Sequence, residues 1–497
     1  MALNTKSLKL KPVGVLDIGS NSIRLVVYQS RSRALMPVFN ERVICGIGRG
    51  LQKTGRLDPK GVKRALKCLP RFAALTKAMD IKDLNIFATA ATREAQDGRK
   101  FIFEVEKLFK KSVKQLDAQQ ETRLGANGII CGMPDADGIT GDLGGGSLEL
   151  ARVDKGVFKS GVSLPLGHLR LLSDLGSRKV PLKSRIDSII EEARWLSDMS
   201  GLRFFYAFGG AWRAIARLHI AQSGYPLSVV HNYSMKADVA LDFCQVIGGL
   251  SQASLPFDES ISSQRAESLP VAALIMHRLI RELSPHEVVF SALGVREGVL
   301  FDRLKKSEKA SDPLIIACHD IAIRESRFMP GSNKLFNWVA PLFIDEGTQM
   351  NRLRLSVCLL ADIGWHEHPD YRAEQVFFRI LRLPLIAVTH EEKATLALAV
   401  YRRYGGNMGS SSLSVVNKLL DVTHIDWSTR LGNALRLAET LSGGQLDLLD
   451  GSSLRASNRR VHLEVDRSIS SLVSDVVRKR LSQLAAQMNK SHQLSIK

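Results

Sequence analysis

Two stretches of the chain repeat one pattern of apolar and polar residues around a glycine-rich turn. They are VLDIGSNSIRLVVY, at residues 15–28, and TGDLGGGSLELARV, at residues 140–153. Short apolar or alternating runs flank each turn, which predicts two antiparallel strands joined by a tight hairpin. A pattern that occurs twice indicates that the chain contains two related halves.

The segments around these turns alternate between helix and strand patterns. Helical periodicity follows the first turn, then comes a short apolar strand and a second helix, and a looser version of this order follows Arg152. Helices are expected at Pro59–Asp80, Phe101–Phe109, Ile186–Leu196 and Trp212–His219, a strand at Leu84–Ala90, and a strand, glycine loop and helix at His286–Leu304. We therefore expect two α/β domains, at residues 1–125 and 126–304.

The pattern changes after Leu304, because strand signals fade and amphipathic helices dominate. Residues 351–365 (NRLRLSVCLLADIGW) and 390–404 (HEEKATLALAVYRRY) are examples, and Gly405–Ser412 has the composition of a loop. We expect a mostly α-helical C-terminal domain at residues 305–497. The last dozen residues are polar, and we expect them to be frayed.

The composition is typical of a globular protein with two to four domains. The chain has 497 residues, of which 45% are hydrophobic and 24% are charged. Its six cysteines are scattered without a CxxC pair, which argues against a disulfide framework or a zinc site and suits a reducing cytoplasm. The basic N-terminal segment lacks an apolar core, and no apolar run is long enough to span a bilayer. We expect a cytoplasmic protein that is not bound to a membrane.

The formal net charge of +19 favours a polyanionic partner. The candidates are nucleic acid, anionic lipid and a phosphate polymer, and the alternative is a solvated basic surface without a specific partner. Nucleic acid is unlikely, because only 6% of the residues are aromatic and they do not interleave with basic ones.

The glycine-rich turns have the composition of an anion-binding site. Where side chains are absent, backbone N–H groups can converge on one point, and serine hydroxyls add donors. The expected phosphate-binding residues are Gly19, Ser20, Asn21 and Ser22 in the first turn and Gly144, Gly145, Gly146 and Ser147 in the second. Either turn alone is also compatible with a plain hairpin. Two such turns in facing halves would hold a phosphate chain from both sides of one cleft.

An aspartate precedes each turn, Asp17 in the first and Asp142 in the second. A carboxylate repels phosphate unless a hard cation lies between them, and Mg²⁺ is the usual one. Glu149, on the strand after the second turn, is a further candidate ligand, although a solvent-facing strand residue has the same pattern. We expect these three carboxylates to hold Mg²⁺ or a similar divalent cation.

The two turns resemble the phosphate-1 and phosphate-2 motifs of the acetate and sugar kinase/Hsp70/actin superfamily. More narrowly, DIGSNSIRLVV, ATREA, ETRL, GDLGGGSLEL, SLPLG and GVREGVL follow one another as in the exopolyphosphatase/guanosine pentaphosphate phosphohydrolase (Ppx/GppA) family. The resemblance covers residues 13 to about 301. It implies two duplicated ribonuclease H-like (actin-like ATPase) α/β halves, and hydrolysis of the terminal phosphoryl group of polyphosphate or pppGpp with Mg²⁺.

The resemblance also implies roles for single residues. Glu121, in AQQETRLGANG, matches the family's catalytic base, although the Ser-Gly that usually precedes it is replaced by Asp-Ala. Arg93, in ATREA, matches an arginine that contacts phosphate, and Gly209 and Gly210 match a glycine pair expected to face the substrate. GVREGVL is expected at the hinge between the halves. From the sequence alone, a surface position is the more typical interpretation of both, with Glu121 on a helix surface paired with Arg123 or Lys114 and Arg93 at a strand-to-helix turn.

Longer members of this family carry a helical domain that resembles HD phosphohydrolases. The corresponding segment, LLADIGWHEHPDYR, has Ala361 in place of a metal-binding histidine and keeps Asp362. His366, Glu367 and His368 have the chemistry of metal ligands, but the missing histidine argues against an HD metal site. We expect a degenerate HD-like domain that serves homodimer formation or substrate channelling.

The expected function is Mg²⁺-dependent exopolyphosphatase activity, which releases orthophosphate from the end of inorganic polyphosphate. The principal alternative is hydrolysis of pppGpp, and the basic charge of the catalytic half favours the polymer. A kinase of the same superfamily and a non-catalytic protein that binds alarmones or RNA are further alternatives. The retained Asp17, Glu121 and Asp142 argue against the non-catalytic one.

Overall fold

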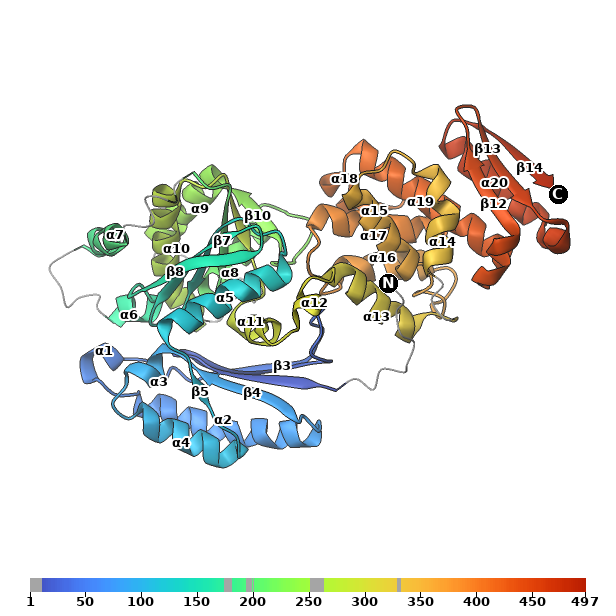
Figure 1. Ribbon diagram of the computed structural model, residues 1–497. Helices are drawn as coiled ribbons and strands as arrows, with labels where there is room; N and C mark the ends of the chain where they lie inside the picture. Colours follow the sequence, from blue (N-terminus) through green and yellow to red (C-terminus); the bar gives the residue numbers. More distant parts are fainter. Residues whose placement is uncertain (1–10, 174–180, 194–198, 200, 251–262, 329–331) are drawn as a thin grey trace. The chain divides into compact units, whose positions relative to one another are not determined.

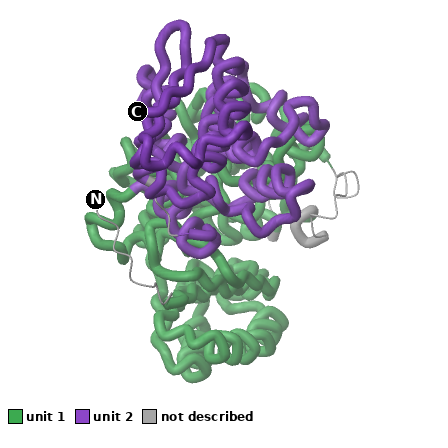
Figure 2. The backbone as a smooth tube through the Cα atoms, turned by 90° about the vertical axis from the view of Figure 1, so that its right-hand side faces the viewer, with its two compact units in different colours: residues 1–311 green, residues 312–497 purple. Residues whose placement is uncertain are grey.

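A computed structural model of the chain describes residues 11–173, 181–193, 199, 201–250, 263–328 and 332–497. The chain forms two compact units, residues 1–311 and 312–497 (Figure 2). The sequence predicts a domain boundary after residue 304, whereas the short helix α12 (Lys306–Lys309) belongs to the first unit. No helix within the described residues is both long and apolar enough to cross a membrane.

The sheet of the first half has five strands in the order β3-β2-β1-β4-β5 (Figure 1). α2 and α4 cover one face of this sheet and share a buried apolar cluster with it. Asp58 caps the first turn of α2, and Pro59 suits its first position because that position needs no N–H donor. The elements are β1 (Val13–Ile18), β2 (Ser22–Tyr28), β3 (Pro37–Ile44), β4 (Asp83–Ala88), β5 (Lys114–Gln115), α1 (Leu51–Thr54), α2 (Pro59–Ala78), α3 (Ala90–Glu94) and α4 (Gly98–Phe109).

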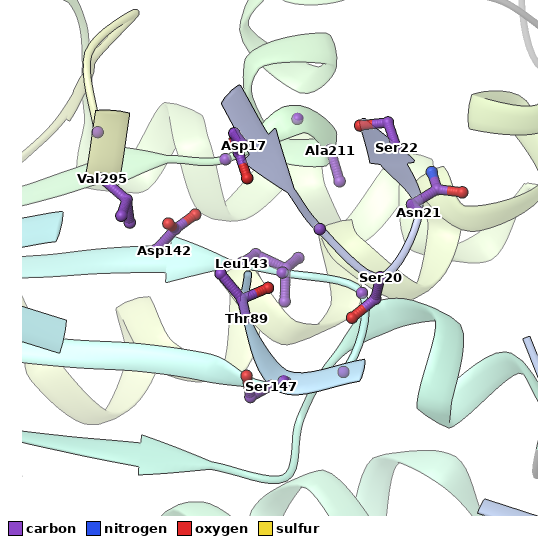
Figure 3. A pocket seen from close by; sticks show the side chains of 18 of the residues that line it. Asp17, Ser20, Asn21, Ser22, Thr89, Asp142, Leu143, Ser147, Ala211 and Val295 are labelled. Atoms are coloured by element: carbon purple, nitrogen blue, oxygen red, sulfur yellow. The ribbon is translucent and has the colours of Figure 1, made fainter. Parts of the chain in front are cut away.

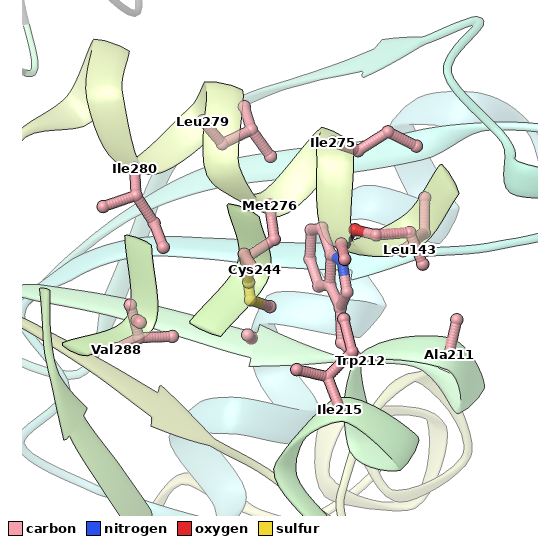
Figure 4. Close-up of a cluster of buried hydrophobic side chains, with 14 of the residues drawn as sticks. Leu143, Ala211, Trp212, Ile215, Cys244, Ile275, Met276, Leu279, Ile280 and Val288 are labelled. Atoms are coloured by element: carbon pink, nitrogen blue, oxygen red, sulfur yellow. Dashed lines mark hydrogen bonds between the residues drawn. The ribbon is translucent and has the colours of Figure 1, made fainter. Parts of the chain in front are cut away.

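The sheet of the second half has six strands in the order β10-β11-β9-β6-β7-β8. A buried cluster joins it to α8 and α10, where Trp212 Nε1 donates to Ala272 O at 3.0 Å (Figure 4). The elements are β6 (Gly138–Leu143), β7 (Leu148–Asp154), β8 (Val157–Leu164), β9 (Phe204–Phe208), β10 (Tyr233–Lys236), β11 (Glu287–Phe290), α6 (His168–Ser173), α7 (Leu182–Glu192), α8 (Gly210–Gln222), α9 (Ala237–Gly249), α10 (Ser263–Leu283) and α11 (Val295–Asp302).

The two sheets repeat one arrangement of strands. The order β3-β2-β1-β4-β5 corresponds to β8-β7-β6-β9-β11, with antiparallel and parallel pairs at the same places. The register also shifts at matching places, between Val27 and Tyr28 and between Arg152 and Val153. The expected pair of duplicated α/β halves is confirmed.

The elements expected in the first 304 residues are present, with changed ends. α2, α4 and α8 lie where helices are expected, and β4 is the expected strand after α2. The strand, glycine loop and helix expected at the end of the second half are β11 and α11. The helix expected at Ile186–Leu196 is α7 up to Glu192, and residues 194–196 lie outside the described residues.

The helix α5 (Ala118–Gly132) crosses the boundary that the sequence predicts between residues 125 and 126. It packs against α11 so closely that a Cβ on Gly128 would lie 2.0 Å from Gly294 O, and one on Gly298 would lie 1.8 Å from Leu124 O. Only glycine fits at these contacts. Since α5 carries Glu121 near its start, this contact fixes its position relative to the first turn of α11.

The second unit is mostly helical, as expected, and it ends in a small sheet of three strands. The elements are α13 (Pro313–Glu325), α14 (Ser332–Val339), α15 (Thr348–Leu360), α16 (Arg372–Arg382), α17 (His390–Arg403), α18 (Ser414–Leu419), α19 (Val422–Ser442), α20 (Asp475–Gln487), β12 (Ser452–Ala456), β13 (Arg460–Val465) and β14 (Ser491–Ile496). The expectation of frayed last residues is wrong, because β14 pairs in parallel with β13. The polar sequence of β14 hides a strand that tertiary pairing stabilises.

Candidate active site

The two glycine-rich turns form hairpins with the same hydrogen bond. Gly19 N–H donates to Ser22 O in the first turn and Gly144 N–H donates to Ser147 O in the second, both at 3.0 Å. A Cβ on either glycine would lie 3.3 Å from that carbonyl oxygen, which is tighter than an ordinary contact. The expected hairpins are confirmed, and they are duplicated in geometry as well as in sequence.

Both turns open into one cavity of about 180 Å³ (Figure 3). The turns also lie against each other, since a Cβ on Gly145 would be 3.3 Å from Ser20 Cβ. The expectation that the two halves direct both turns into one cleft is therefore confirmed. The predicted site residues that line the cavity are Asp17, Gly19, Ser20, Asn21, Ser22, Glu121, Asp142, Gly144, Gly145, Gly146, Ser147, Gly209 and Gly210.

Gly209 joins the end of β9 to the start of α8 beside this cavity. Its φ of +94° lies in the region that favours glycine, and a Cβ there would lie 2.8 Å from Asp142 Oδ1 and 2.7 Å from Leu143 O. The N-terminus of α8 therefore begins next to the cavity, with Gly210 as its first residue. The free N–H groups and the dipole of a helix N-terminus both favour a bound anion.

Asp142 and Glu149 form a buried pair of carboxylates, because they are opposite each other in the register of β6 and β7. Glu149 is 4% exposed and accepts a hydrogen bond from Ser163 Oγ at 3.0 Å, so the solvent-facing alternative is wrong. It does not line the cavity itself. Burial raises the pKa of Asp142 to about 6 and that of Glu149 to about 7, and Asp142 adds to the second shift. A cation nearby would stabilise both ionised groups.

Glu121 lies near the start of α5 and is 8% exposed, so the alternative of a surface glutamate is wrong. Asp117 Oδ1 accepts a hydrogen bond from Gln120 N–H at 2.7 Å, and the two residues form a capping box. Asp117, which belongs to the Asp-Ala pair that replaces the family's usual Ser-Gly, thus still caps the start of the helix. Burial raises the pKa of Glu121 well above its usual range, Glu149 raises it further, and Arg93 opposes both.

Arg93 holds Glu121 and does not line the cavity. Its Nη1 lies 3.3 Å from Glu121 Oε2 and also donates to Leu116 O. The carbonyl contact and the ion pair together restrain the guanidinium group. A direct contact between Arg93 and phosphate stays a prediction.

Asp17 already has a cationic partner, which the sequence did not indicate. Arg296 Nη1 donates to Asp17 Oδ2 at 2.9 Å. The neighbouring Glu297 accepts hydrogen bonds from the Tyr28 hydroxyl and, at 2.8 Å, from Gly294 N–H. Burial raises the pKa of Asp17, and Arg296 opposes this shift. A chain of polar contacts therefore connects β1 and β2 of the first half with α11 of the second.

Four arginines line the cavity, and the sequence reasoning missed all of them; they are Arg24, Arg42, Arg213 and Arg296. One signal was present, because Arg24 follows Ser22 by two residues and side chains at that spacing share a strand face. Arg42 lies opposite Arg24 on β3, a pairing that only the fold reveals. Burial lowers the pKa of Arg24 to about 10.

Arg213 is held in place by backbone carbonyls rather than by carboxylates. Its Nε donates to Gly209 O at 2.9 Å and its Nη1 to Ala292 O at 2.6 Å. Burial lowers its pKa to about 9, with Arg296 and Arg24 adding to the shift. The guanidinium group thus brings a positive charge to the cavity that no ion pair within the described residues neutralises.

Of the three predicted metal ligands, Asp17 and Asp142 line the cavity and Glu149 does not, and their ligand atoms do not converge on one point. Within the described part of the chain, three ligand atoms lie within 4.8 Å of one another only at Glu391, Asp421 and His424, in the second unit. Asp421 is the N-cap of α19 there, which accounts for its contact with His424. Asp17, Asp142 and Glu149 nevertheless have the oxygen chemistry that Mg²⁺ prefers.

In the second unit, the expected HD-like segment is tied to arginines. Arg327 donates to Asp362 through its side chain at 2.6 Å and through its N–H at 2.9 Å. The side chains of His366 and His368 are 48% and 66% exposed. Asp362, the acid that this segment keeps from the expected motif, thus has a guanidinium partner, and the degenerate HD-like assignment stays a prediction.

The cavity combines the groups that phosphoryl transfer needs. Two nests of backbone N–H groups and four arginines can bind phosphate oxygens, and buried carboxylates can hold a cation or accept a proton. Phosphoryl transfer depends mostly on such positioning and electrostatic stabilisation.

Comparisons with known proteins identify relatives whose family acts on phosphate groups. The model of the Ppx/GppA phosphatase family matches residues 26–307, and the model described as exopolyphosphatase, C-terminal, matches residues 314–494. Retrograde regulation protein 2 of Saccharomyces cerevisiae is 27% identical over 444 residues, which are 80% of this chain and 73% of that protein. Exopolyphosphatase 1 of Mycobacterium tuberculosis (strain H37Rv) is 24% identical over 306 residues, 59% of this chain and 88% of that protein.

Solved structures share the fold of the two halves. The exopolyphosphatase from Cytophaga hutchinsonii has a TM-score of 0.54 at 18% identity, and it covers 59% of this chain and 99% of its own. The Ppx/GppA family member from Aquifex aeolicus has a TM-score of 0.50 at 21% identity, with 59% and 97% covered. These likenesses support the actin-like architecture of the halves. Since the family model matches more than half of its residues, the chain belongs to the Ppx/GppA phosphatase family.

Proposed function

We propose that this protein is an exopolyphosphatase, which releases orthophosphate from the end of inorganic polyphosphate with the help of Mg²⁺ or a similar divalent cation. The observation that carries the proposal is the convergence of two glycine-rich turns, one from each half, on a cavity that also holds Glu121 and four arginines. The family match over residues 26–307 and the relatives named exopolyphosphatase support it.

In the proposed reaction, the turns and the arginines hold the terminal phosphates through N–H donors. Glu121 orients a water molecule and takes its proton as the water oxygen bonds to the terminal phosphorus. The bond between that phosphorus and the bridging oxygen breaks, so that orthophosphate and a chain shorter by one phosphate leave. The raised pKa of Glu121 suits a base that acts near neutral pH.

The residues that would hold the divalent cation are Asp142, Glu149 and Asp17. Burial and repulsion from Asp17 raise the pKa of Asp142, burial and repulsion from Asp142 raise the pKa of Glu149, and a cation would relieve both effects. Asp17 would share its carboxylate between the cation and Arg296. When bound, the cation would neutralise charge that builds up on the transferred group.

The alternative substrate is pppGpp, whose triphosphate end offers the same phosphoanhydride bond. The aromatic lining of the cavity favours the polymer over this nucleotide. Phe87 and Phe208 line the cavity, but each is only 2% exposed and offers little ring surface on which guanine could stack.

The test compares phosphate release from long-chain polyphosphate and from pppGpp by the purified protein, with Mg²⁺ and with excess EDTA. We expect faster release from polyphosphate and loss of activity in EDTA. Faster phosphate release from pppGpp would mean that pppGpp is the substrate in place of polyphosphate. Full activity in EDTA would show that the reaction needs no divalent cation. Transfer of phosphate to an acceptor in place of release would identify a kinase. The expected homodimer and cytoplasmic location stay predictions.

A further inference from the structure

The start of α6 holds the second glycine-rich turn through backbone contacts. The N–H groups of Leu169 and Arg170 both donate to Gly145 O, at 3.0 and 3.1 Å. A Cβ on Gly167 would lie 2.1 Å from the carbonyl carbon of Gly146, so the chain just before α6 packs directly on the turn. A displacement of Arg170 therefore displaces the second turn with it.

The side chain of Arg170 crosses from the second half to the first. Its Nη2 donates to Glu94 Oε2 at 2.6 Å, and Glu94 is the last residue of α3. The same carboxylate oxygen accepts a hydrogen bond from Gln52 Nε2, on α1, at 3.1 Å. Glu94 thus joins a guanidinium group of the second half to an amide group of the first.

This ion pair lies behind the two glycine-rich turns rather than in the large cavity. Arg170, Glu94 and Gln52 line a separate cavity of about 20 Å³, and none of the three lines the large one. The residues that line both cavities are Ser20, Ala90, Gly145 and Gly146, of which all but Ala90 belong to the turns. The ion pair therefore acts on a ligand in the large cavity only through the turns.

The pair is placed to affect geometry more than stability. The side chains of Arg170 and Glu94 are 16% and 34% exposed, and ion pairs that water reaches contribute little to the stability of a fold. The pair nevertheless lies beside the contact between the halves, where a Cβ on Gly145 would be 3.3 Å from Ser20 Cβ. A small change in the separation of the halves there changes the distance between the two turns.

We propose that Arg170 and Glu94 are positioning residues, whose ion pair holds the second glycine-rich turn against the first so that both turns bind the same substrate molecule. The proposal rests on the proposed function, because its ligand is the phosphate chain of the substrate. Hydrogen bonds weaken steeply with distance and angle, so the donors of both turns reach one ligand only at a defined spacing. Loss of the ion pair should therefore weaken substrate binding, although neither residue touches the substrate.

The first experiment measures binding of tripolyphosphate to the full-length Glu121→Gln protein, in which the ligand is not consumed. Arg170→Met and Glu94→Met should each weaken binding by about tenfold, within the range that misplaced binding groups cause. The double variant should bind no more weakly than the weaker single variant, because both substitutions break one contact. Gln52→Met should have a much smaller effect, since its hydrogen bond joins two helices of the same half.

The matched control is the ion pair between Arg71 and Glu41, which lies within the first half. Arg71 Nε donates to Glu41 Oε1 at 2.9 Å, and the side chains are 61% and 27% exposed. Arg71→Met and Glu41→Met should leave the affinity unchanged. All four single variants should lower the melting temperature by less than about 4 °C, as expected for partly exposed pairs. Arg170→Lys keeps the charge and should recover part of the affinity.

A larger fall in melting temperature for Arg170→Met and Glu94→Met, in proportion to the lost affinity, would overturn the positioning role in favour of a structural one. With Glu121 intact, the variants should raise the KM for polyphosphate and change kcat by less than about twofold, the signature of lost binding. A fall in kcat at unchanged KM would overturn the assignment to the turns. It would show instead that the pair orients Glu121 through Arg93, the neighbour of Glu94 in the chain.

The outcomes also separate this proposal from the proposed function. If the wild-type protein hydrolyses neither polyphosphate nor pppGpp, but its binding of tripolyphosphate depends on Arg170 and Glu94, the proposed function is wrong and the positioning role is supported. If the protein hydrolyses polyphosphate and both variants keep the wild-type affinity and KM, the positioning role alone is overturned.

Discussion

At the scale of single residues, Glu121 has the features of a catalytic base: it is buried at the cavity and its pKa is raised. We expect Glu121→Gln to lower kcat by about 10²–10⁴-fold, the usual contribution of general base catalysis. Binding of polyphosphate should change little, because the substitution keeps the shape of the side chain. Phosphate release measures the first effect and titration with polyphosphate the second. A variant with most of the wild-type kcat would exclude Glu121 as the base.

The contact between Arg93 and Glu121 leads to a prediction about pH. Glu121 acts as a carboxylate, so activity is lost as the pH falls through its pKa in the complex that reacts. Arg93 opposes the rise of that pKa. Arg93→Gln should therefore raise the pKa further and move the acid limb of the kcat/KM profile to higher pH. The control is Arg31→Gln, whose ion pair with Asp83 is exposed. An unchanged or lower acid limb would contradict the assignment.

Much of the candidate site could be predicted from single residues and short motifs. The residues that could not be predicted in this way were missed for a physical reason. Asp17 and Asp142 were predicted from short stretches, because each stands on a strand directly before a glycine-rich turn, whereas Glu121 was predicted only from the resemblance to the family. The pairing of Asp17 with Arg296 could not be found in this way, because β1 and α11 are far apart in the chain. The same holds for Arg42, which reaches the cavity only through pairing of β3 with β2.

At the scale of elements, Tyr28 links β2 to α11 through its hydrogen bond to Glu297. Tyr28→Phe should destabilise the protein by about 1–3 kcal/mol, because a buried carboxylate loses a donor. It should also lower kcat/KM, since Glu297 lies beside the Arg296 that holds Asp17. The control is Tyr206→Phe, which removes a buried hydroxyl bonded to Asp137 N–H. Equal losses of kcat/KM in both variants would mean that the link serves stability alone.

The close contact between α5 and α11 predicts that a single methyl group added at Gly128 destabilises the protein. A Cβ on Gly128 would lie 2.0 Å from Gly294 O, so Gly128→Ala must move the two helices apart. We expect a loss of about 1–3 kcal/mol in the free energy of unfolding, as for overpacked interiors. Gly249→Ala, at the end of α9, is the matched control because no atom lies within 4 Å of its added Cβ. Denaturant unfolding measures both, and similar values would disprove the close contact.

Elements with a strong period were predictable, and those that depend on pairing were not. α2 has clear helical periodicity and capping, and β6 and β7 flank a glycine turn, so local sequence determines them. β14, with the sequence SHQLSI, has no comparable apolar alternation and is a strand because β13 pairs with it. The helix α5 continues through the predicted boundary between residues 125 and 126, since a repeat in sequence shows that two halves exist but not where one continuous helix links them.

At the scale of the whole molecule, duplication explains how two similar hairpins come to serve one cavity. Each half places its hairpin at the same position of its sheet, and the facing halves bring Ser20 against Gly145. A bound anion would therefore receive donors from two separately folded sheets. Binding in this geometry couples the ligand to the relative position of the halves, which a single hairpin could not do.

The division into two units gives the last prediction. Every residue that lines the cavity lies before residue 297, inside the unit that ends at Ser311, and both sheets of that unit have their own buried clusters. A fragment of residues 1–311 should therefore fold and still cleave short polyphosphate. Truncation after Leu304 is the informative comparison, because it removes α12, from which Lys309 Nζ donates to Asp302 O and Lys309 O accepts from Arg33 Nε.

We expect the fragment that ends at Leu304 to melt at a lower temperature than the one that ends at Ser311, since it loses these contacts. Thermal unfolding and phosphate release from tripolyphosphate check both fragments against the full chain. A folded 1–311 fragment without any activity would show that residues 312–497 are needed for the chemistry itself. A fragment that retains cleavage of tripolyphosphate but loses the preference for long chains would place chain-length selection in the second unit.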